Sequence, residues 1–261
     1  MENDNGLSSL RQHQLKAVEA LKELDVICKE NGIHYFLEAG SCLGAIRHKG
    51  FIPWDDDIDV DMDLANFNKF RKIIKEKKGL KYIWKHTDVD LNFPSLTGKF
   101  LDKEEPLITV FPLVKLSDNR LKAKTQWWIR KVISPVYQRK VHYPLEKINL
   151  VQIFSLIVSG FLSCFFSKRK VLEILRWNEQ RYEHLDTEYS INIYSKYSMK
   201  RESIRNEWLK DFALTEFEGG QYPIIKNYHA YLTHLYGDYM TPPPESQRNA
   251  EHLEIVANRK K

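Results

Sequence analysis

Hydrophobic and polar positions change their spacing several times along the chain, and each spacing predicts a different element. Near the N-terminus apolar residues recur at about every third position, which predicts an amphipathic helix over 9–31. The pair Asn31-Gly32 suits the C-terminal cap of that helix. A short apolar run then predicts a strand over 33–37.

The later pattern predicts further strands, and between them a helix over 65–78 that ends near Gly79. The strands are expected at 57–62, 81–85 and 107–116. From residue 120 onward the pattern is mainly helical, with breaks expected near Pro135, Pro144 and Pro223. The fold class is therefore α+β, with a mixed β-sheet flanked by helices and a mainly helical C-terminal part. We expect one catalytic unit, with its core in 1–120 and a helical part in 121–261 that completes the site.

In and beside the strand predicted at 57–62, the sequence places a carboxylate at every odd position from 55 to 63. Successive side chains of a strand point to opposite faces, so these carboxylates would share one face and apolar residues the other. The acidic residues are Asp55, Asp57, Asp59, Asp61 and Asp63. A line of like charges is unfavourable unless a cation intervenes, and a divalent metal is the simplest such cation.

Two alternatives to this metal site are a solvated acidic edge strand and a calcium-binding loop. Edge strands more often carry Lys or charges of both signs. The calcium loop requires Gly and Glu where this chain has Val60 and Asn66, so it is rejected. Carboxylates spaced two residues apart suit Mg²⁺ that is shared with substrate phosphates.

A small-residue turn precedes this acidic run. Gly40-Ser41 follows the strand predicted at 33–37 and leads into a short helix predicted over Cys42–Arg47. Such a turn lets backbone N–H groups approach a ligand, and a helix N-terminus favours anions. The sequence therefore predicts a phosphate-binding turn beside a metal site.

These two motifs carry a family resemblance. An apolar strand, Gly40-Ser41 and then Asp57-Ile58-Asp59-Val60 resemble the nucleotidyltransferase-fold signature. More narrowly, the stretch 40–59 resembles the LicD family, which includes phosphocholine transferases and is similar to fukutin-related proteins. A second block over 217–252 resembles the C-terminal part of that family, whereas about 115–195 matches poorly.

The resemblance implies a nucleotidyltransferase-like sheet and an enzyme that requires Mg²⁺, with Mn²⁺ as an alternative. It implies transfer of a phospho-alcohol such as phosphocholine from a CDP-activated donor. The acceptor would be a hydroxyl of a cell-surface glycan or of its lipid-linked precursor, as in lipopolysaccharide, teichoic acid or capsular polysaccharide. Two alternatives stay open: a nucleotidyltransferase that moves a nucleoside monophosphate, and a catalytically degenerate glycan- or nucleotide-binding relative.

By the same resemblance, Asp57 and Asp59 are the metal ligands and catalytic residues, with Asp55 as a third participant. The residues expected to bind substrate are Gly40, Ser41, Arg47, Lys99, Arg248 and His252. Within that set, the Gly40-Ser41 turn and the two arginines would contact donor phosphates. For His252 the role is that of a base or a phosphate ligand.

The chain departs from the family pattern at a third carboxylate, which relatives tend to carry in an Ile-Asp-Ile-Phe-Pro-Leu-Asp stretch. The corresponding segment here is 108–114, with Thr109 and Val114 at the acidic positions. We consider six acidic residues as substitutes: Glu38, Asp61, Asp63, Glu104, Glu105 and Asp118. The same loss motivates the degenerate-relative alternative.

Composition narrows the function further. The net charge of +5 comes from dispersed basic residues without a nucleic-acid-binding motif, so we expect no nucleic-acid partner. The three cysteines, Cys28, Cys42 and Cys164, lack the spacing of a disulfide framework or a zinc site. The polar N-terminus lacks the pattern of a signal peptide, so we expect a cytoplasmic enzyme.

The apolar segment 148–166 allows three interpretations: a membrane-spanning helix, a buried core helix and a helix lying on the membrane surface. Basic residues flank the segment, and Gln152, Ser155, Ser159 and Ser163 form a polar stripe at helical spacing. A spanning helix would separate the two motif blocks across the bilayer. The surface helix would make the enzyme peripheral at the inner face of the membrane.

Overall fold

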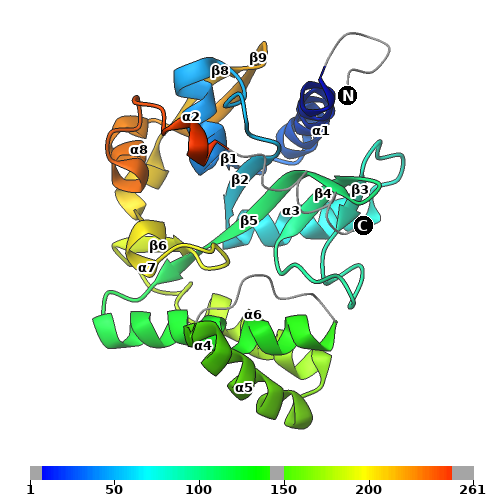
Figure 1. The fold of residues 1–261 in the computed structure, drawn as a ribbon, viewed down its shortest axis with the longest axis vertical. Helices are drawn as coiled ribbons and strands as arrows, with labels where there is room; N and C mark the ends of the chain where they lie inside the picture. Colours follow the sequence, from blue (N-terminus) through cyan, green and yellow to red (C-terminus); the bar gives the residue numbers. More distant parts are fainter. Residues whose placement is uncertain (1–7, 142–149, 249–261) are drawn as a thin grey trace. The chain divides into compact units, whose positions relative to one another are not determined.

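The computed structural model describes residues 8–141 and 150–248, and its contacts divide the chain into two compact units (Figure 1). The first unit consists of residues 1–85, 98–111 and 208–261. The second consists of residues 86–97 and 112–207. The chain therefore leaves the first unit and returns to it twice.

The first unit contains most of a β-sheet in which the strand order is β1-β2-β5-β4-β3. These strands are β1 (Phe36–Leu37), β2 (Ile58–Asp63), β3 (Ile83–Lys85), β4 (Gly98–Asp102) and β5 (Glu105–Leu116). Helices α1 (Ser9–Glu30), α2 (Ala39–His48) and α3 (Leu64–Glu76) belong to the same unit. All three helices and all five strands were predicted in outline except β4, which follows a turn-rich segment.

Helix α1 forms where the periodicity predicts it. Ser8 caps its N-terminus by accepting a hydrogen bond from the Arg11 backbone N–H. Ala17, Leu21 and Leu24 are fully buried, because residues three and four apart share one face. Leu15, which also fits the period, is 39% exposed at the edge of that face.

The acidic run is only partly a strand, which corrects the expectation that five carboxylates share one strand face. Strand β2 begins at Ile58, so Asp55 and Asp57 lie in the loop before it. Asp63 caps helix α3 by accepting a hydrogen bond from the Asn66 backbone N–H at 2.8 Å. The apolar residues of β2 are fully buried, as the alternation predicts.

The C-terminal segment of the first unit contains a hairpin and a helix. Strands β8 (Phe212–Phe217) and β9 (Gly220–Ile225) pair in antiparallel register, and helix α8 (Tyr228–Tyr236) follows. Strand β9 contacts β1, and Phe212 of β8 stacks on Phe36 with ring centroids 5.6 Å apart. The hairpin was not predicted, and Pro223 lies inside β9 rather than at a break.

The second unit is built on α4 (Arg120–Lys140), with α5 (Leu150–Phe165) and α6 (Lys168–Gln180) packed against it (Figure 1). Its core includes Val136 and Tyr137 of α4 and Leu172 of α6. The last residues of β5 pair with β6 (Tyr189–Asn192), which pairs with β7 (Ser203–Arg205). The short helix α7 (Met199–Glu202) lies between these two strands.

Two expectations about this unit need correction or lie outside the described residues. Helix α4 continues through Pro135, so no break occurs there. The break expected at Pro144 falls outside the described residues. Among the residues that the structure describes, no helix is both long and apolar enough to cross a bilayer.

The fold class is confirmed: a mixed sheet is flanked by helices, and the C-terminal part is mainly helical. The division at residue 120 into two parts of one catalytic unit stays a prediction.

Candidate active site

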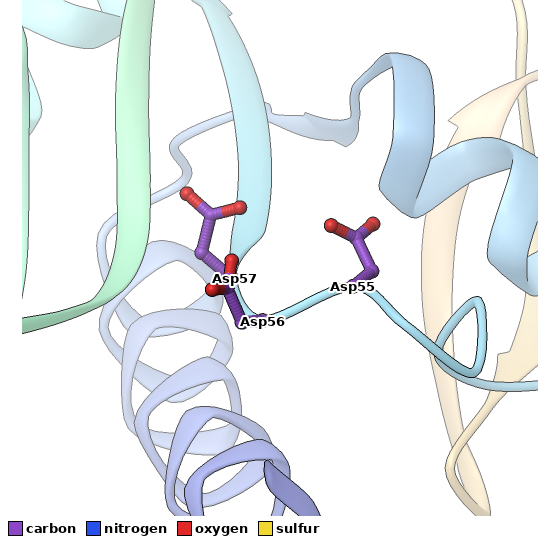
Figure 2. A group of neighbouring side chains, drawn as sticks. All are labelled: Asp55, Asp56 and Asp57. Atoms are coloured by element: carbon purple, nitrogen blue, oxygen red, sulfur yellow. The ribbon is translucent and has the colours of Figure 1, made fainter. Parts of the chain in front are cut away.

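Three consecutive carboxylates form the acidic site of the first unit. Asp55, Asp56 and Asp57 each place one oxygen within 4.8 Å of the others, on the loop ahead of β2 (Figure 2). Asp56 and Asp57 are buried, with 1% and 6% of their surface exposed. An ion that binds oxygen at about 2.0–2.6 Å holds ligand atoms that are at most roughly 5 Å apart. The three carboxylates therefore suit one hard divalent cation such as Mg²⁺ or Mn²⁺.

Helix α1 and a tight turn hold the backbone of this acidic loop. The Asp55 N–H donates to the Ile52 carbonyl at 2.8 Å. The buried side chain of Gln14 donates from Nε2 to the Asp55 carbonyl, also at 2.8 Å. With its backbone held on both sides, the loop presents the carboxylates in a fixed arrangement.

An ion pair from the β8–β9 turn braces the start of the same loop. Glu218 accepts two hydrogen bonds from the Arg11 guanidinium, at 2.9 and 2.6 Å, and a third from the Phe51 N–H at 3.2 Å. The hydrogen bond from Arg11 is the main cause that lowers the pKa of Glu218. The C-terminal hairpin thus anchors the loop that carries the acidic site.

Helix α2 begins at Ala39, so Gly40 and Ser41 lie in its first turn, which corrects the prediction of a turn there before a helix over Cys42–Arg47. A Cβ atom at Gly40 would lie 3.2 Å from Asp55 Oδ2, so the glycine leaves room for that carboxylate. The Ser41 N–H donates to the Glu38 carbonyl at 2.9 Å, and Ser41 Oγ accepts from the Asp59 N–H at 2.8 Å. Ser41 therefore fixes α2 to β2, and its hydroxyl proton is the group it can still donate to a ligand.

A second layer of acidic residues lies behind the loop. Asp61 is fully buried on β2, and Glu38, whose N–H donates to the Asp59 carbonyl, is 6% exposed. Burial raises the pKa of Tyr231 well above its usual value, and the charges of Glu38 and Asp61 raise it further. Tyr231 accepts a hydrogen bond from the Ala39 N–H at 3.0 Å, which ties α8 to the start of α2.

Strand β5 brings Thr109 to the acidic loop. Thr109 Oγ1 donates to Asp57 Oδ2 at 3.5 Å, and its partner across the ladder is Lys99 of β4. Paired residues of neighbouring strands share one face, so Lys99 lies on the same face as Thr109. The position at which the family resemblance leads us to expect Asp is thus beside Asp57, and a neutral hydroxyl occupies it.

The six acidic residues considered as substitutes lie in different places. Glu38 and Asp61 are buried next to the site, whereas Asp63 caps α3. Glu104 is exposed, and the carboxylate of Glu105 lies 3.7 Å from His13 Nδ1. Asp118 belongs to the second unit, where it accepts a hydrogen bond from the Glu188 N–H. Glu38 and Asp61 are therefore the two buried residues among the six.

Two arginines from distant segments gather at the edge of the loop. Arg248 lies over the ring of Trp54, the residue before Asp55, at 5.0 Å from the ring centroid. Arg47 Nη1 donates to the Tyr239 carbonyl at 2.7 Å. Burial lowers the pKa of Arg47, Tyr236 opposes that shift, and the charge of Arg248 lowers the pKa further. Two positive charges that repel each other in this way would both be favoured by an anion.

The structure therefore brings most of the predicted site residues together within the first unit. Asp59 lies on β2 outside the group of three carboxylates, and its role as a metal ligand stays a prediction. His252 lies outside the described residues. Sequence reasoning missed Asp56, because strict alternation assigned it to the opposite face. The continuous acidic run 55–57 was the signal for it.

Comparison with known proteins finds similarity to one family. Residues 32–157 match a family model described as LicD/FKTN/FKRP, nucleotidyltransferase domain. Over 277 aligned residues the chain is 28% identical to lipopolysaccharide cholinephosphotransferase LicD of Haemophilus influenzae, covering 94% of this chain and 97% of that protein. The chain is therefore similar to LicD proteins, over just under half of its length for the family model and over nearly all of it for the Haemophilus protein.

More distant members of the LicD family match shorter segments. Ribitol 5-phosphate transferase FKRP of Homo sapiens is 46% identical over 43 residues, which are 15% of this chain and 9% of that protein. Ribitol-5-phosphate transferase FKTN of Mus musculus is 23% identical over 148 residues, covering 52% and 32% of the two chains. The chain thus spans nearly all of the Haemophilus protein but a third or less of the other two.

Proposed function

We propose that the chain is a Mg²⁺-dependent transferase that moves a phospho-alcohol, such as phosphocholine, from a CDP-activated donor to a glycan hydroxyl. The acceptor is a cell-surface glycan or its lipid-linked precursor. The observation that carries this proposal is the group of carboxylates at Asp55–Asp57 with Arg47 and Arg248 at its edge. The names of the relatives, which act as cholinephosphotransferase and ribitol phosphate transferases, support the same reaction class.

In this reaction the acceptor hydroxyl oxygen bonds to the donor phosphorus that carries the alcohol, and the bond from that phosphorus to CMP breaks. A bound Mg²⁺ supplies charge neutralisation for the donor diphosphate. Asp55, Asp56 and Asp57 would hold that ion. Arg47 and Arg248 would bind the diphosphate oxygens, and Gly40 keeps space open against the Asp55 carboxylate.

Metal-dependent binding of donors tests the proposal. Calorimetry with CDP-choline, CDP-ribitol, CDP-glycerol and CTP, each with and without Mg²⁺, compares the wild type with Asp57→Asn. The matched control is Glu76→Gln, an exposed carboxylate at the end of α3 in the same unit. We expect one CDP-alcohol to bind selectively with Mg²⁺, and this binding to be lost in Asp57→Asn and retained in Glu76→Gln.

Other outcomes identify the alternatives. A preference for CTP over every CDP-alcohol would favour nucleotidyl transfer. Equal binding with and without Mg²⁺ in all variants would favour a degenerate relative. The neutral Thr109 beside Asp57 is the observation behind that last alternative.

The second unit supports a further part of the proposal, contact with a membrane surface through α5. In this helix Ser159 is fully buried, whereas Phe161 and Phe165 are 67% and 68% exposed. The two rings contact each other at 5.0 Å between centroids. Basic residues 168–170 follow directly, which suits an anionic lipid surface.

Vesicle sedimentation tests this contact. We expect wild type to bind vesicles that contain anionic lipid, and the double variant Phe161→Ser/Phe165→Ser to lose most of that binding. Leu121→Ser, at an exposed apolar residue of α4, is the control that should still bind. Unchanged binding by the double variant would show that α5 is not the contact.

A further inference from the structure

The second unit contains a group of cations and aromatic rings that lies apart from the acidic loop in sequence and unit. Its cations are Arg130 and Lys131 of α4 and Arg201 of α7, and the charge of each lowers the pKa of Glu202. Trp127, Tyr194 and Tyr197 supply the rings. We call these seven residues the α4–α7 cluster. Three cations around one carboxylate leave an excess of positive charge.

The rings and cations are stacked on each other. The Arg130 guanidinium lies 5.8 Å from the ring centroids of both Trp127 and Tyr194, and Lys131 Nζ lies 4.6 Å from that of Trp127. Arg201 lies over Tyr197 at 3.8 Å. Cation–π contacts orient a charge but do not neutralise it, so the cluster remains positively charged.

The two α4 cations in this cluster, Arg130 and Lys131, have hydrogen-bond donors without an acceptor among the described residues. Arg130 Nη2 donates to the Tyr194 carbonyl at 2.6 Å, yet its buried Nε has no hydrogen-bond partner among the described residues. The ammonium of Lys131 makes its contact with the Trp127 ring, and no hydrogen bond or ion pair of Lys131 is found within residues 8–141 and 150–248. Buried donors without acceptors are costly, so an anionic ligand here would be favourable.

The carboxylate within the cluster does not neutralise it. Glu202 is 4% exposed, and burial raises its pKa, while the surrounding cations and Ser195 oppose that shift. Burial, together with the charge of Arg130, lowers the pKa of Lys131 to about 8, although the charge of Glu202 opposes the shift. A second anion would relieve the repulsion between the two neighbouring α4 cations.

We propose that the α4–α7 cluster is a binding site for a phosphorylated saccharide, distinct from the acidic site. The phosphate would accept hydrogen bonds from Lys131 and Arg130, and the partly exposed rings of Trp127 and Tyr197 would pack on the apolar face of the sugar. This proposal rests on the proposed function in one respect: such a site would hold an anionic part of the glycan acceptor.

Calorimetry on the full chain tests the site with glucose-6-phosphate, glucose and inorganic phosphate. We expect glucose-6-phosphate to bind more tightly than either of the other two compounds. Lys131→Gln should weaken that binding by about tenfold or more, because a hydrogen bond to a charged group is lost. Lys122→Gln, at an exposed lysine of the same helix, should bind as the wild type does.

A measurement on the wild type avoids reliance on a folded variant. Because its pKa is lowered, Lys131 should react with an amine-acylating reagent at pH near 8 faster than the exposed Lys122. Glucose-6-phosphate should protect Lys131 and leave Lys122 unprotected, as mapped by mass spectrometry. Absence of protection, or equal binding of glucose and glucose-6-phosphate, would overturn the proposal.

The variant Asp57→Asn distinguishes binding at the α4–α7 cluster from binding at the acidic site. That variant should lose Mg²⁺-dependent donor binding and keep the affinity for glucose-6-phosphate. If Asp57→Asn instead abolishes saccharide phosphate binding, the ligand is held at the acidic site and the α4–α7 cluster is not its site.

Discussion

At the residue scale, the acidic loop depends on single side chains that other segments supply. Gln14 and Glu218 each hold one part of the loop backbone, although neither belongs to the acidic motif. Local patterns identify carboxylates in a run, but not the distant amide or ion pair that fixes them. This is why Asp55 and Asp57 could be predicted while their supports could not.

Glu218→Gln should destabilise the protein in a pH-dependent way. Its folded-state pKa is lowered, mainly by Arg11, so its contribution is present above the unfolded-state value and is lost as pH falls through the folded-state pKa. Because Arg11 is 37% exposed, solvent screening limits the loss to about 1–2 kcal/mol at neutral pH. Urea unfolding of both proteins at neutral and acidic pH measures this, and the difference should shrink in acid. A constant difference would contradict the ion-pair explanation.

Thr109→Asp should make stability depend on Mg²⁺ more strongly than in the wild type. The new carboxylate would lie beside Asp57, so without metal the repulsion should cost roughly 1–2 kcal/mol. Added Mg²⁺ should restore the loss, because it neutralises the extra charge. Thermal unfolding with and without Mg²⁺ measures both effects, with the neutral Thr109→Asn as control. An identical Mg²⁺ response in the Asp and Asn variants would place Thr109 away from the metal.

At the element scale, α2 contains the predicted phosphate-binding residues Gly40 and Ser41 and precedes the acidic loop. Its two inner glycines meet different neighbours. A Cβ at Gly40 would approach the end of a side chain, Asp55 Oδ2, at 3.2 Å. A Cβ at Gly44 would lie 2.5 Å from the Gly50 carbonyl oxygen, which is backbone. The first contact can relax by a side-chain rotation, whereas the second requires α2 or the loop to move.

Gly44→Ala should therefore reduce stability, whereas Gly40→Ala should reduce donor binding. Gly44→Ala should destabilise the fold by about 1–3 kcal/mol, the usual range for overpacking. Gly40→Ala should leave stability nearly unchanged, since Ala is the better helix former, but should weaken Mg²⁺-dependent donor binding by displacing the Asp55 carboxylate. Chemical unfolding and calorimetry on both variants separate the two effects. Equal loss of stability in both would show that the Gly40 contact is structural.

Elements whose apolar pattern lies within one segment could be predicted, whereas elements that depend on distant partners could not. Helices α1 and α3 and strand β2 were predicted because their apolar period lies within one segment, and Asn31 indicated the end of α1. The structure adds Ser8 and Asp63 as local N-terminal caps of α1 and α3. Strands β6 to β9 are only three to six residues long and pair with partners that a local pattern does not identify. Helix α5 was predicted, but the side of it that is buried was not, because Ser159 is buried while Phe161 and Phe165 are exposed.

At the scale of the whole molecule, the active site depends on the return of the chain. Residues 208–261 belong to the first unit, although about a hundred residues of the second unit separate them from β5. Phe217 packs on Phe51 at 5.2 Å between ring centroids, and Tyr231 binds the start of α2. The resemblance of two separate sequence blocks predicted that both contribute to one site, and these contacts give the physical reason.

The returning segment should therefore remain bound after its covalent link is cut. A protease site inserted between the exposed residues Lys210 and Asp211 would separate it from the rest of the chain. We expect the fragment to co-elute with the remainder in size-exclusion chromatography, because β9 contacts β1 and the Arg11–Glu218 ion pair survives. Cleaved Tyr231→Phe is the comparison: it leaves the Ala39 N–H without its acceptor and should release the fragment at lower urea concentrations. Immediate loss of the wild-type fragment would mean that the covalent link, rather than these contacts, holds the first unit together.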